Sequence, residues 1–430
     1  MTDITAGSST PAMKPPRAVV GPIAWLRDNL FSSVSNSIVT LIGLALLYLI
    51  GKGLITFAVI NATWVAKDGA DCAKNDGACW PFVFAKFGQF MYGTFPEEIR
   101  WRPKLVYLLA IVALVPLMFA GLRDKLQVLA WMAAGSAALI AAKYAFEMSG
   151  STFTGFTEMV DPVFLVAVCA LTLVTVFLEE KTGKTPFALF FFFIFPFITF
   201  VLLVGGFFGL DYVATNFWGG MLVTLVVATT GIVAAFPLGI ALALGRRSNM
   251  PIIKGASVAF IEFIRGVPLI TILFLSSVML PLFLPPGWNI DKLLRALFMV
   301  MLFSAAYLAE VIRGGLQAIP RGQFEAADAL GLNYRQKMSL IVLPQALKLV
   351  IPGIVNSFIG LFKDTSLVLI IGLFDLLGVV QKNMSDAKWY APTTVMTGYL
   401  FAGFMFWVFC FGMSRYSQSV ERRLAAGDQR

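Results

Sequence analysis

Long apolar stretches separated by short polar or charged segments dominate the chain. A helix needs about 20 predominantly apolar residues to cross the hydrocarbon core of a bilayer. Ten stretches meet or approach this length, and we expect each of them to form a transmembrane helix. They are residues 37–60, 105–122, 126–142, 163–178, 187–208, 218–244, 257–284, 293–312, 346–371 and 393–413. The pattern predicts an all-α, polytopic membrane protein.

Lysine and arginine gather in alternate polar segments of the chain, namely 123–125, 179–184, 313–348 and the region after 413. Positive charge favours the cytoplasmic side of a membrane. Ten spans with a cytoplasmic N-terminus place all of these segments on that side. Segment 61–103 is then periplasmic. We interpret residues 1–36 as a cytoplasmic N-terminal tail, which lacks the pattern of a signal peptide and is disordered at its start.

Composition supports lipid as the solvent for much of the chain. Of 430 residues, 58% are hydrophobic and 13% are charged, whereas soluble domains have about 25% charged residues. The net charge of +9 fits cytoplasmic loops and gives no reason to expect nucleic-acid binding. Histidine is absent from the sequence, and no nucleophile, base and ligand set converges. We therefore expect no catalytic residue and no metal site.

Two sequence features resemble known sites and leave questions open. Cys72 and Cys79 lie in the predicted periplasmic segment, where an oxidising compartment permits a disulfide, but their spacing alone does not decide whether they pair. Gly183, Lys184 and Thr185 resemble the end of a phosphate-binding loop. The complete pattern needs glycine where Leu178 stands, so we expect no ATP or other cofactor in this chain.

Residues 314–345 form a long polar segment with the composition of helices. Pro320 suits a first helical turn, and Gly331 suits the end of a helix. Asn333 and Gln336 have the spacing of a capping box at the start of a second helix, which we expect to stop near Pro344. The segment therefore predicts two helices on the cytoplasmic side.

One face of the first predicted helix combines Phe324, Ala327 and Leu330 at helical spacing. Small side chains there permit the close approach of a partner protein. The alternative is a helix that lies on lipid headgroups. The residue pattern alone leaves both interpretations open.

The same segment carries a long spaced motif that resembles the cytoplasmic signature of binding-protein-dependent permeases of ATP-binding-cassette (ABC) importers. The matching residues are Glu325, Ala326, Ala327, Gly331, Ile341, Leu343 and Pro344. In that family the motif forms the coupling helix, which docks into a groove on the ATPase subunit. The resemblance implies partner docking and two separate ATP-binding subunits that hold ATP and magnesium.

Two further strings resemble the polar amino acid branch of these permeases. One runs from Glu262 through Arg265 and Pro268, and the other comprises residues 361–367 and follows Asn356. The resemblance implies a type I ABC importer permease core over residues 211–425, with coupling helices at 314–345. Residues 37–210 then form an extension of five spans with the periplasmic loop 61–103. This extension resembles that of larger permeases for general L-amino acids or for glutamate, glutamine, aspartate and asparagine.

Ionisable residues inside a predicted span are the candidate substrate site. An amino acid is a zwitterion, and charged groups at membrane depth are costly and usually functional. Lys363 would meet its carboxylate and Asp364 its ammonium group. Asn356 lies seven residues before Lys363 and shares its helical face. The alternative is that Lys363 and Asp364 pair with other buried groups and only fix helix packing.

Three further positions and one gate region complete the predicted site. Thr365, Ser366 and Glu262 are further substrate-binding candidates. Arg265 and Pro268 are candidates for a gate or for packing, and we expect Pro268 to kink its helix.

The resemblance implies the permease subunit of an ATP-driven importer, which moves polar L-amino acids from periplasm to cytoplasm by alternating access. Its setting would be the lipid of the bacterial inner membrane. Its partners would be two ATP-binding subunits, a second permease of related type and a periplasmic amino-acid-binding protein. The alternative is an ion-coupled secondary transporter, which would work alone. The sequence does not identify the amino acid.

Overall fold

The computed structural model describes residues 22–119, 121–148, 156, 159–288 and 290–428. The start of the predicted N-terminal tail lies outside the described residues. Secondary structure within these ranges is helical, and the chain divides into two compact units. The first comprises residues 1–62 and 75–78, and the second comprises residues 63–74 and 79–430.

The first unit contains helix α1 (Pro22–Asn29) and the apolar helix α2 (Val34–Ile55), which a π turn extends to Ile60. The hydroxyl of Ser33 caps the start of α2 by accepting a hydrogen bond from the Asn36 backbone N–H. Together Val34–Ile60 form one run of 27 residues, long and apolar enough to span a membrane.

The N-terminal part of the second unit supplies four more spans. Its helices are α3 (Gly69–Cys72), α4 (Trp80–Tyr92), α5 (Trp101–Met118), α6 (Leu122–Met148), α8 (Pro162–Thr182), α9 (Thr185–Leu189) and α10 (Phe195–Val204). Cys72 and Cys79 are joined by a disulfide that closes the short loop between α3 and α4.

The C-terminal part of the second unit is a bundle in which α11 packs along α15, α15 along α18, and α18 along α20. Its helices are α11 (Met221–Arg246), α12 (Pro251–Gly266), α13 (Leu269–Phe274), α14 (Leu280–Phe283), α15 (Lys292–Ala318), α16 (Arg321–Ala329), α17 (Tyr334–Gln336), α18 (Leu343–Asp364), α19 (Leu376–Met384) and α20 (Pro392–Asp428). One buried apolar cluster joins this bundle to α5 and α10, so both parts share a core.

The described residues contain nine helices long and apolar enough to cross a membrane, or ten when one bent pair is counted as a span. This agrees with the predicted all-α fold of about ten spans. The bent pair consists of α12 and Leu269–Phe283, with an angle of 100° between them. Val267 at the break is extended, as expected before a proline. The predicted kink at Pro268 is thus a complete break.

The prediction that the second helix of segment 314–345 stops near Pro344 is wrong. The helical run continues from Tyr334 to Ile371 as one membrane span. A π turn, Lys337–Val342, comes directly before Pro344, which sits in the first turn of α18. A proline normally disrupts a helix because it lacks an N–H and its ring clashes with the preceding turn. The wider π turn relieves that clash.

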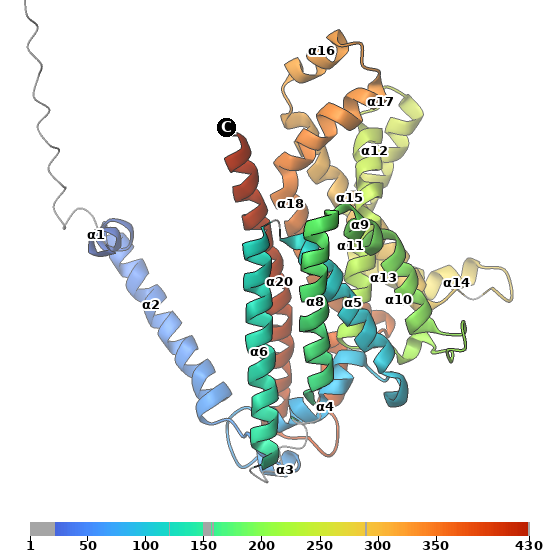
Figure 1. Cartoon of the computed structure of the whole chain (residues 1–430). Coiled ribbons are helices and arrows are strands. Elements are labelled where there is room, and N and C mark those ends of the chain that lie inside the picture. The colour runs from blue at the N-terminus through green and yellow to red at the C-terminus, as the bar shows by residue number, and fades with distance from the viewer. Residues whose placement is uncertain (1–21, 120, 149–155, 157–158, 289, 429–430) are drawn as a thin grey trace, which may run out of the picture. The chain divides into compact units, whose positions relative to one another are not determined.

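The second unit has its short helices at opposite ends of the bundle. Helices α16 and α17 lie at one end together with α12, and α3 and α4 lie at the other end (Figure 1). Because positive charge favours the cytoplasmic side of a membrane, the end with α16 and α17 is called cytoplasmic here. The end with α3 and α4 is accordingly called periplasmic.

Candidate functional site

Residues 314–345, called the coupling segment below, contain a tight turn that local backbone and side-chain interactions stabilise. Pro320 was predicted in the first turn of a helix. In the structure it is the N-cap, the residue directly before α16 begins. Gly331 has a φ of 72°, a left-handed conformation that glycine adopts without strain. Asn333 and Gln336 form the predicted capping box, each side chain bonding the other residue's backbone N–H. These contacts fix α16 relative to the helix that follows.

The apolar face of α16 packs against its own chain. Ala327 is fully buried, and the half-buried Phe324 packs against a cluster that includes Leu316, Met338 and Val342. In this chain the helix that follows covers much of this face, so Phe324 and Ala327 offer little surface to a partner, and docking of the segment on a partner stays a prediction. The exposed surface of α16 and its end instead presents Glu325, Ala326 and Leu330.

Polar contacts hold α16 in place from both sides. The Lys337 ammonium pairs with Asp328 at 2.6 Å, and the Gln345 amide donates to the Gln323 carbonyl oxygen at 3.1 Å. The Arg247 guanidinium lies 5.6 Å from the centre of the Phe324 ring. It also donates to the Leu316 carbonyl at 2.7 Å. A force on α16 would thus reach both α11, through Arg247, and α18.

Within the motif, buried and exposed residues take different positions. Ile341 and Leu343 are half-buried on the helix that supports α16, and Pro344 is exposed at its start. The motif therefore combines residues that support the segment with residues that remain accessible.

A cluster of charged side chains joins the C-terminal parts of α11, α12 and α15. Glu310 is its centre and pairs with Arg246 at 2.7 Å, Arg313 at 2.8 Å and Arg265 at 3.8 Å. Arg246 also pairs with Glu262 at 2.8 Å. Glu262, a predicted substrate residue, and Arg265, a predicted gate or packing residue, are therefore brought together by the same network.

Sequence reasoning did not find the centre of this cluster. Glu310 and Arg313 lie near the end of a predicted span, where long charged side chains ordinarily extend toward the lipid surface. Their spacing of three residues could have indicated an ion pair within one helix. The contacts with Arg246 and Arg265 depend on the packing of three helices, which no local pattern specifies.

The other predicted substrate residues lie at the far end of α18. The side chains of Asn356, Lys363 and Asp364 make no hydrogen bond or ion pair with the described residues, and Asn356 and Lys363 are exposed. Thr365 is buried and donates to the Phe362 carbonyl at 2.8 Å.

The Ser366 hydroxyl donates to the Lys363 carbonyl at 3.0 Å. It therefore uses its proton within the chain and keeps its oxygen lone pairs available, whereas the Thr365 hydroxyl is almost fully buried. The ion pairs that the packing alternative requires for Lys363 and Asp364 are missing from the described part of the chain.

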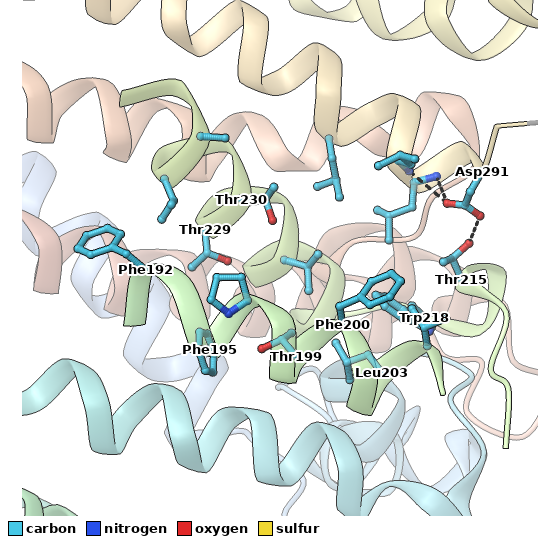
Figure 2. A pocket seen from close by; sticks show the side chains of 18 of the residues that line it. Phe192, Phe195, Thr199, Phe200, Leu203, Thr215, Trp218, Thr229, Thr230 and Asp291 are labelled. Atoms are coloured by element: carbon cyan, nitrogen blue, oxygen red, sulfur yellow. Dashed lines mark hydrogen bonds between the residues drawn. The ribbon is translucent and has the colours of Figure 1, made fainter. Parts of the chain in front are cut away.

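A cavity of about 570 Å³ opens between α10, α11 and the start of α15 (Figure 2). Phenylalanines such as Phe192, Phe195 and Phe200 line much of it, and a 2.5 Å hydrogen bond from Thr215 to Asp291 lies at one end. None of the predicted substrate residues contributes to its wall. An apolar wall does not replace the hydration of a zwitterion, so this cavity is unsuited to an amino acid.

The fold is that of a polytopic membrane protein with a helical segment, residues 314–345, at one end of its bundle. Residues 235–426 match the family model described as "Binding-protein-dependent transport system inner membrane component". The chain is 45% identical over 405 residues to the inner membrane amino-acid ABC transporter permease protein YhdY of Escherichia coli, covering 94% of each chain.

Two further relatives differ in length. The chain is 40% identical over 429 residues to the glutamate/glutamine/aspartate/asparagine transport system permease protein BztC of Rhodobacter capsulatus, covering 95% of each. It is 34% identical over 209 residues to the probable glutamine ABC transporter permease protein GlnP of Bacillus subtilis. That match covers 48% of this chain and 92% of the relative.

The chain therefore belongs to the binding-protein-dependent ABC transporter permeases, and it is a transmembrane permease subunit of an ATP-driven importer. The resemblance drawn from the cytoplasmic motif is confirmed. An ion-coupled secondary transporter, the alternative from sequence, does not agree with this family.

Proposed function

We propose that this permease carries polar L-amino acids from the periplasm to the cytoplasm across the bacterial inner membrane. The names of the two long relatives, an amino-acid permease and a glutamate/glutamine/aspartate/asparagine permease, support this substrate class. The chain would work with a second permease, two ATP-binding subunits and a periplasmic amino-acid-binding protein.

The observation that carries the proposal is the set of unpartnered polar side chains near the end of α18. Lys363 and Asp364 lie within an apolar helix run, where a charge facing lipid is costly. Their face of α18 therefore requires an aqueous pathway or a second permease beside it. There Lys363 would bind the substrate carboxylate and Asp364 the ammonium group, and Asn356 would add hydrogen bonds. Thr365 and Ser366 would offer acceptor oxygens nearby.

Coupling would run from α16 to the charged cluster. The exposed Glu325 and Ala326 would dock on an ATP-binding subunit, and Ala327, Ile341 and Leu343 would hold α16 on the bundle. Gly331 and Pro344 would permit the turn and the helix start that follow. ATP and magnesium belong to the partner subunits, where hydrolysis takes place, and this chain contributes no catalytic group.

Alternating access would follow when the ATP-binding subunits close and pull on α16. Arg247 links α16 to the end of α11, beside the network of Arg246, Glu262, Arg265 and Glu310. Because this network joins three helices by ion pairs, we assign it to the cytoplasmic exit. Glu262 would therefore act near the exit, away from Lys363.

Substrate-stimulated ATPase activity of the complete complex in proteoliposomes tests the site. We expect Lys363→Ala and Asp364→Ala each to reduce the stimulation at least about tenfold, since each loses a charge-assisted hydrogen bond. The matched control is Lys254→Ala, an exposed lysine on α12 without a side-chain partner among the described residues. Unchanged stimulation in assembled variants would assign Lys363 and Asp364 to packing.

A further inference from the structure

A second cavity, of about 350 Å³, lies at the periplasmic end, between α4 of the extension and α19 of the core. We call it the seam pocket. Its wall includes Lys86 and Gln89 from α4, Asn216 from the connection before α11, and Lys382, Asn383 and Asp386 from α19 and the turn after it. Its volume is at the lower end of the range of small-molecule sites, which restricts it to a small ligand.

Direct contacts join the two sides of the seam pocket. The Lys86 ammonium pairs with the Asp386 carboxylate at 2.5 Å. The Cys79 backbone N–H donates to the Thr397 hydroxyl at 2.9 Å, and the disulfide ties α3 to the start of α4. At Gly93 an added Cβ would lie 2.4 Å from the Gly219 backbone. These contacts hold α4 against the core, so the pocket is a defined part of the fold.

Several polar groups in its wall keep hydrogen-bonding capacity that the described residues do not use. Lys382 forms no ion pair there, and its ammonium lies 5.1 Å from the centre of the Phe374 ring. The side-chain amides of Gln89 and Asn216 make no hydrogen bond with described residues. Asn383 donates its amide N–H to the Val379 carbonyl at 2.9 Å, which leaves its side-chain oxygen as an acceptor.

These groups suit a zwitterion with an additional negative charge. The wall contains two ammonium groups, Lys86 and Lys382, and one carboxylate, Asp386. Because Lys86 and Asp386 neutralise each other, Lys382 remains as the net positive charge. Amides supply donors for carboxylate oxygens, and the oxygen atoms of Asn383 and Asp386 can accept from an ammonium group.

We propose that the seam pocket is a periplasmic binding subsite for an acidic amino acid such as glutamate or aspartate. Lys382, with the amides of Gln89 and Asn216, would bind its carboxylates, and Asn383 and Asp386 would bind its ammonium group. Its lining residues lie outside the candidate membrane spans and do not include Lys363 or Asp364. It rests on the proposed function of the chain as an amino acid permease, and it gives the extension a role, because α4 supplies one wall.

Equilibrium binding of radiolabelled L-glutamate tests the subsite, with the complex in nanodiscs lacking ATP and the binding protein. We expect Lys382→Gln to weaken glutamate binding at least about tenfold, as for the loss of one hydrogen bond to a charged group. Excess L-lysine should compete poorly. Lys382 is exposed, so the exchange leaves the core intact. The control is Lys388→Gln, an exposed lysine that lies over the Trp389 ring and outside the pocket.

Other outcomes overturn the proposal without affecting the proposed function. Unchanged glutamate binding by Lys382→Gln, together with lost ATPase stimulation by Lys363→Ala, would leave the membrane site and exclude the subsite. Weaker association of the binding protein with unchanged direct glutamate binding would assign the pocket to that protein interface. If no amino acid stimulates the wild-type complex, the proposed function itself fails.

Discussion

Asp375 shows how one side chain at the periplasmic end combines a structural contact with a sensitivity to pH. It is fully buried at the start of α19 and accepts hydrogen bonds from the backbone N–H groups of Gly378, at 2.9 Å, and Leu377, at 3.2 Å. Burial raises the pKa of this carboxyl from 3.8 to about 6, and the backbone hydrogen bonds oppose the rise only in part. The folded chain therefore binds this proton more tightly than the unfolded chain.

This pKa difference predicts that Asp375 makes the fold more stable as pH falls from about 6 to about 4. A rise of about two pKa units corresponds to about 3 kcal/mol in the free energy of unfolding. This stability is present below the pKa of Asp375 in the unfolded chain and is lost as pH rises through its pKa in the folded chain. Asp375→Asn keeps a capping side chain but removes the titration.

The measurement is the apparent melting temperature of the purified full chain between pH 4.5 and 7.5. At each pH, the difference between the melting temperatures of the wild type and the variant isolates the effect of Asp375 from that of other titrating groups. If the melting temperatures of the two proteins change with pH in parallel, this role for Asp375 is excluded.

At the scale of elements, α16 has an inward and an outward side with different tasks. Ala327 and Phe324 fasten it to the chain, and Glu325, Ala326 and Leu330 stay accessible. A substitution on the inward side would disturb packing, whereas one on the outward side would act on a partner. Glu325 therefore provides the cleaner test of coupling.

We expect Glu325→Lys to reduce co-purification of the ATP-binding subunits and ATP-driven uptake at least about tenfold, a loss of about 1.4 kcal/mol in docking. Because Glu325 is exposed, the variant should still insert and show an unchanged melting temperature. Glu98→Lys makes the same charge reversal at an exposed position of the periplasmic segment and should behave as wild type. Normal uptake by Glu325→Lys would contradict the coupling role of this surface.

At the scale of the whole molecule, membership of the ABC permease family implies transport that depends on partners. The wall of the seam pocket and the charged cluster are each assembled from elements far apart in the sequence. On α18, Asn356 and Lys363 are exposed, Asp364 is half-buried, and none of the three has a side-chain partner among the described residues. A complete pathway therefore requires further subunits.

Proteoliposomes that contain this chain alone should show no amino acid uptake, with or without an ion gradient. Uptake should appear only when the second permease, the binding protein and the ATP-binding subunits are added with ATP and magnesium. A parallel measurement of inserted protein confirms that the chain is present. Gradient-driven uptake by the chain alone would favour a secondary carrier.

The sequence by itself determined the membrane setting, the approximate spans and the turn of the coupling segment. These depend on local physics: apolar length in lipid, the left-handed conformation at Gly331 and the capping box at Asn333. The same local rules predicted a kink at Pro268, where the structure has a complete break. They were wrong at Pro344, because a preceding π turn accommodated the proline.

Only the tertiary structure decided which side of α16 is covered, that Glu310 is the centre of an ion-pair network, and that α4 and α19 enclose a polar pocket. Each depends on side chains that lie far apart along the chain and meet through helix packing. Hydrophobic attraction is non-directional, so an apolar pattern predicts that helices pack but does not select their neighbours. The neighbours then decide which polar groups pair, as Lys86 does with Asp386, and which remain available for a ligand, as Lys382 does.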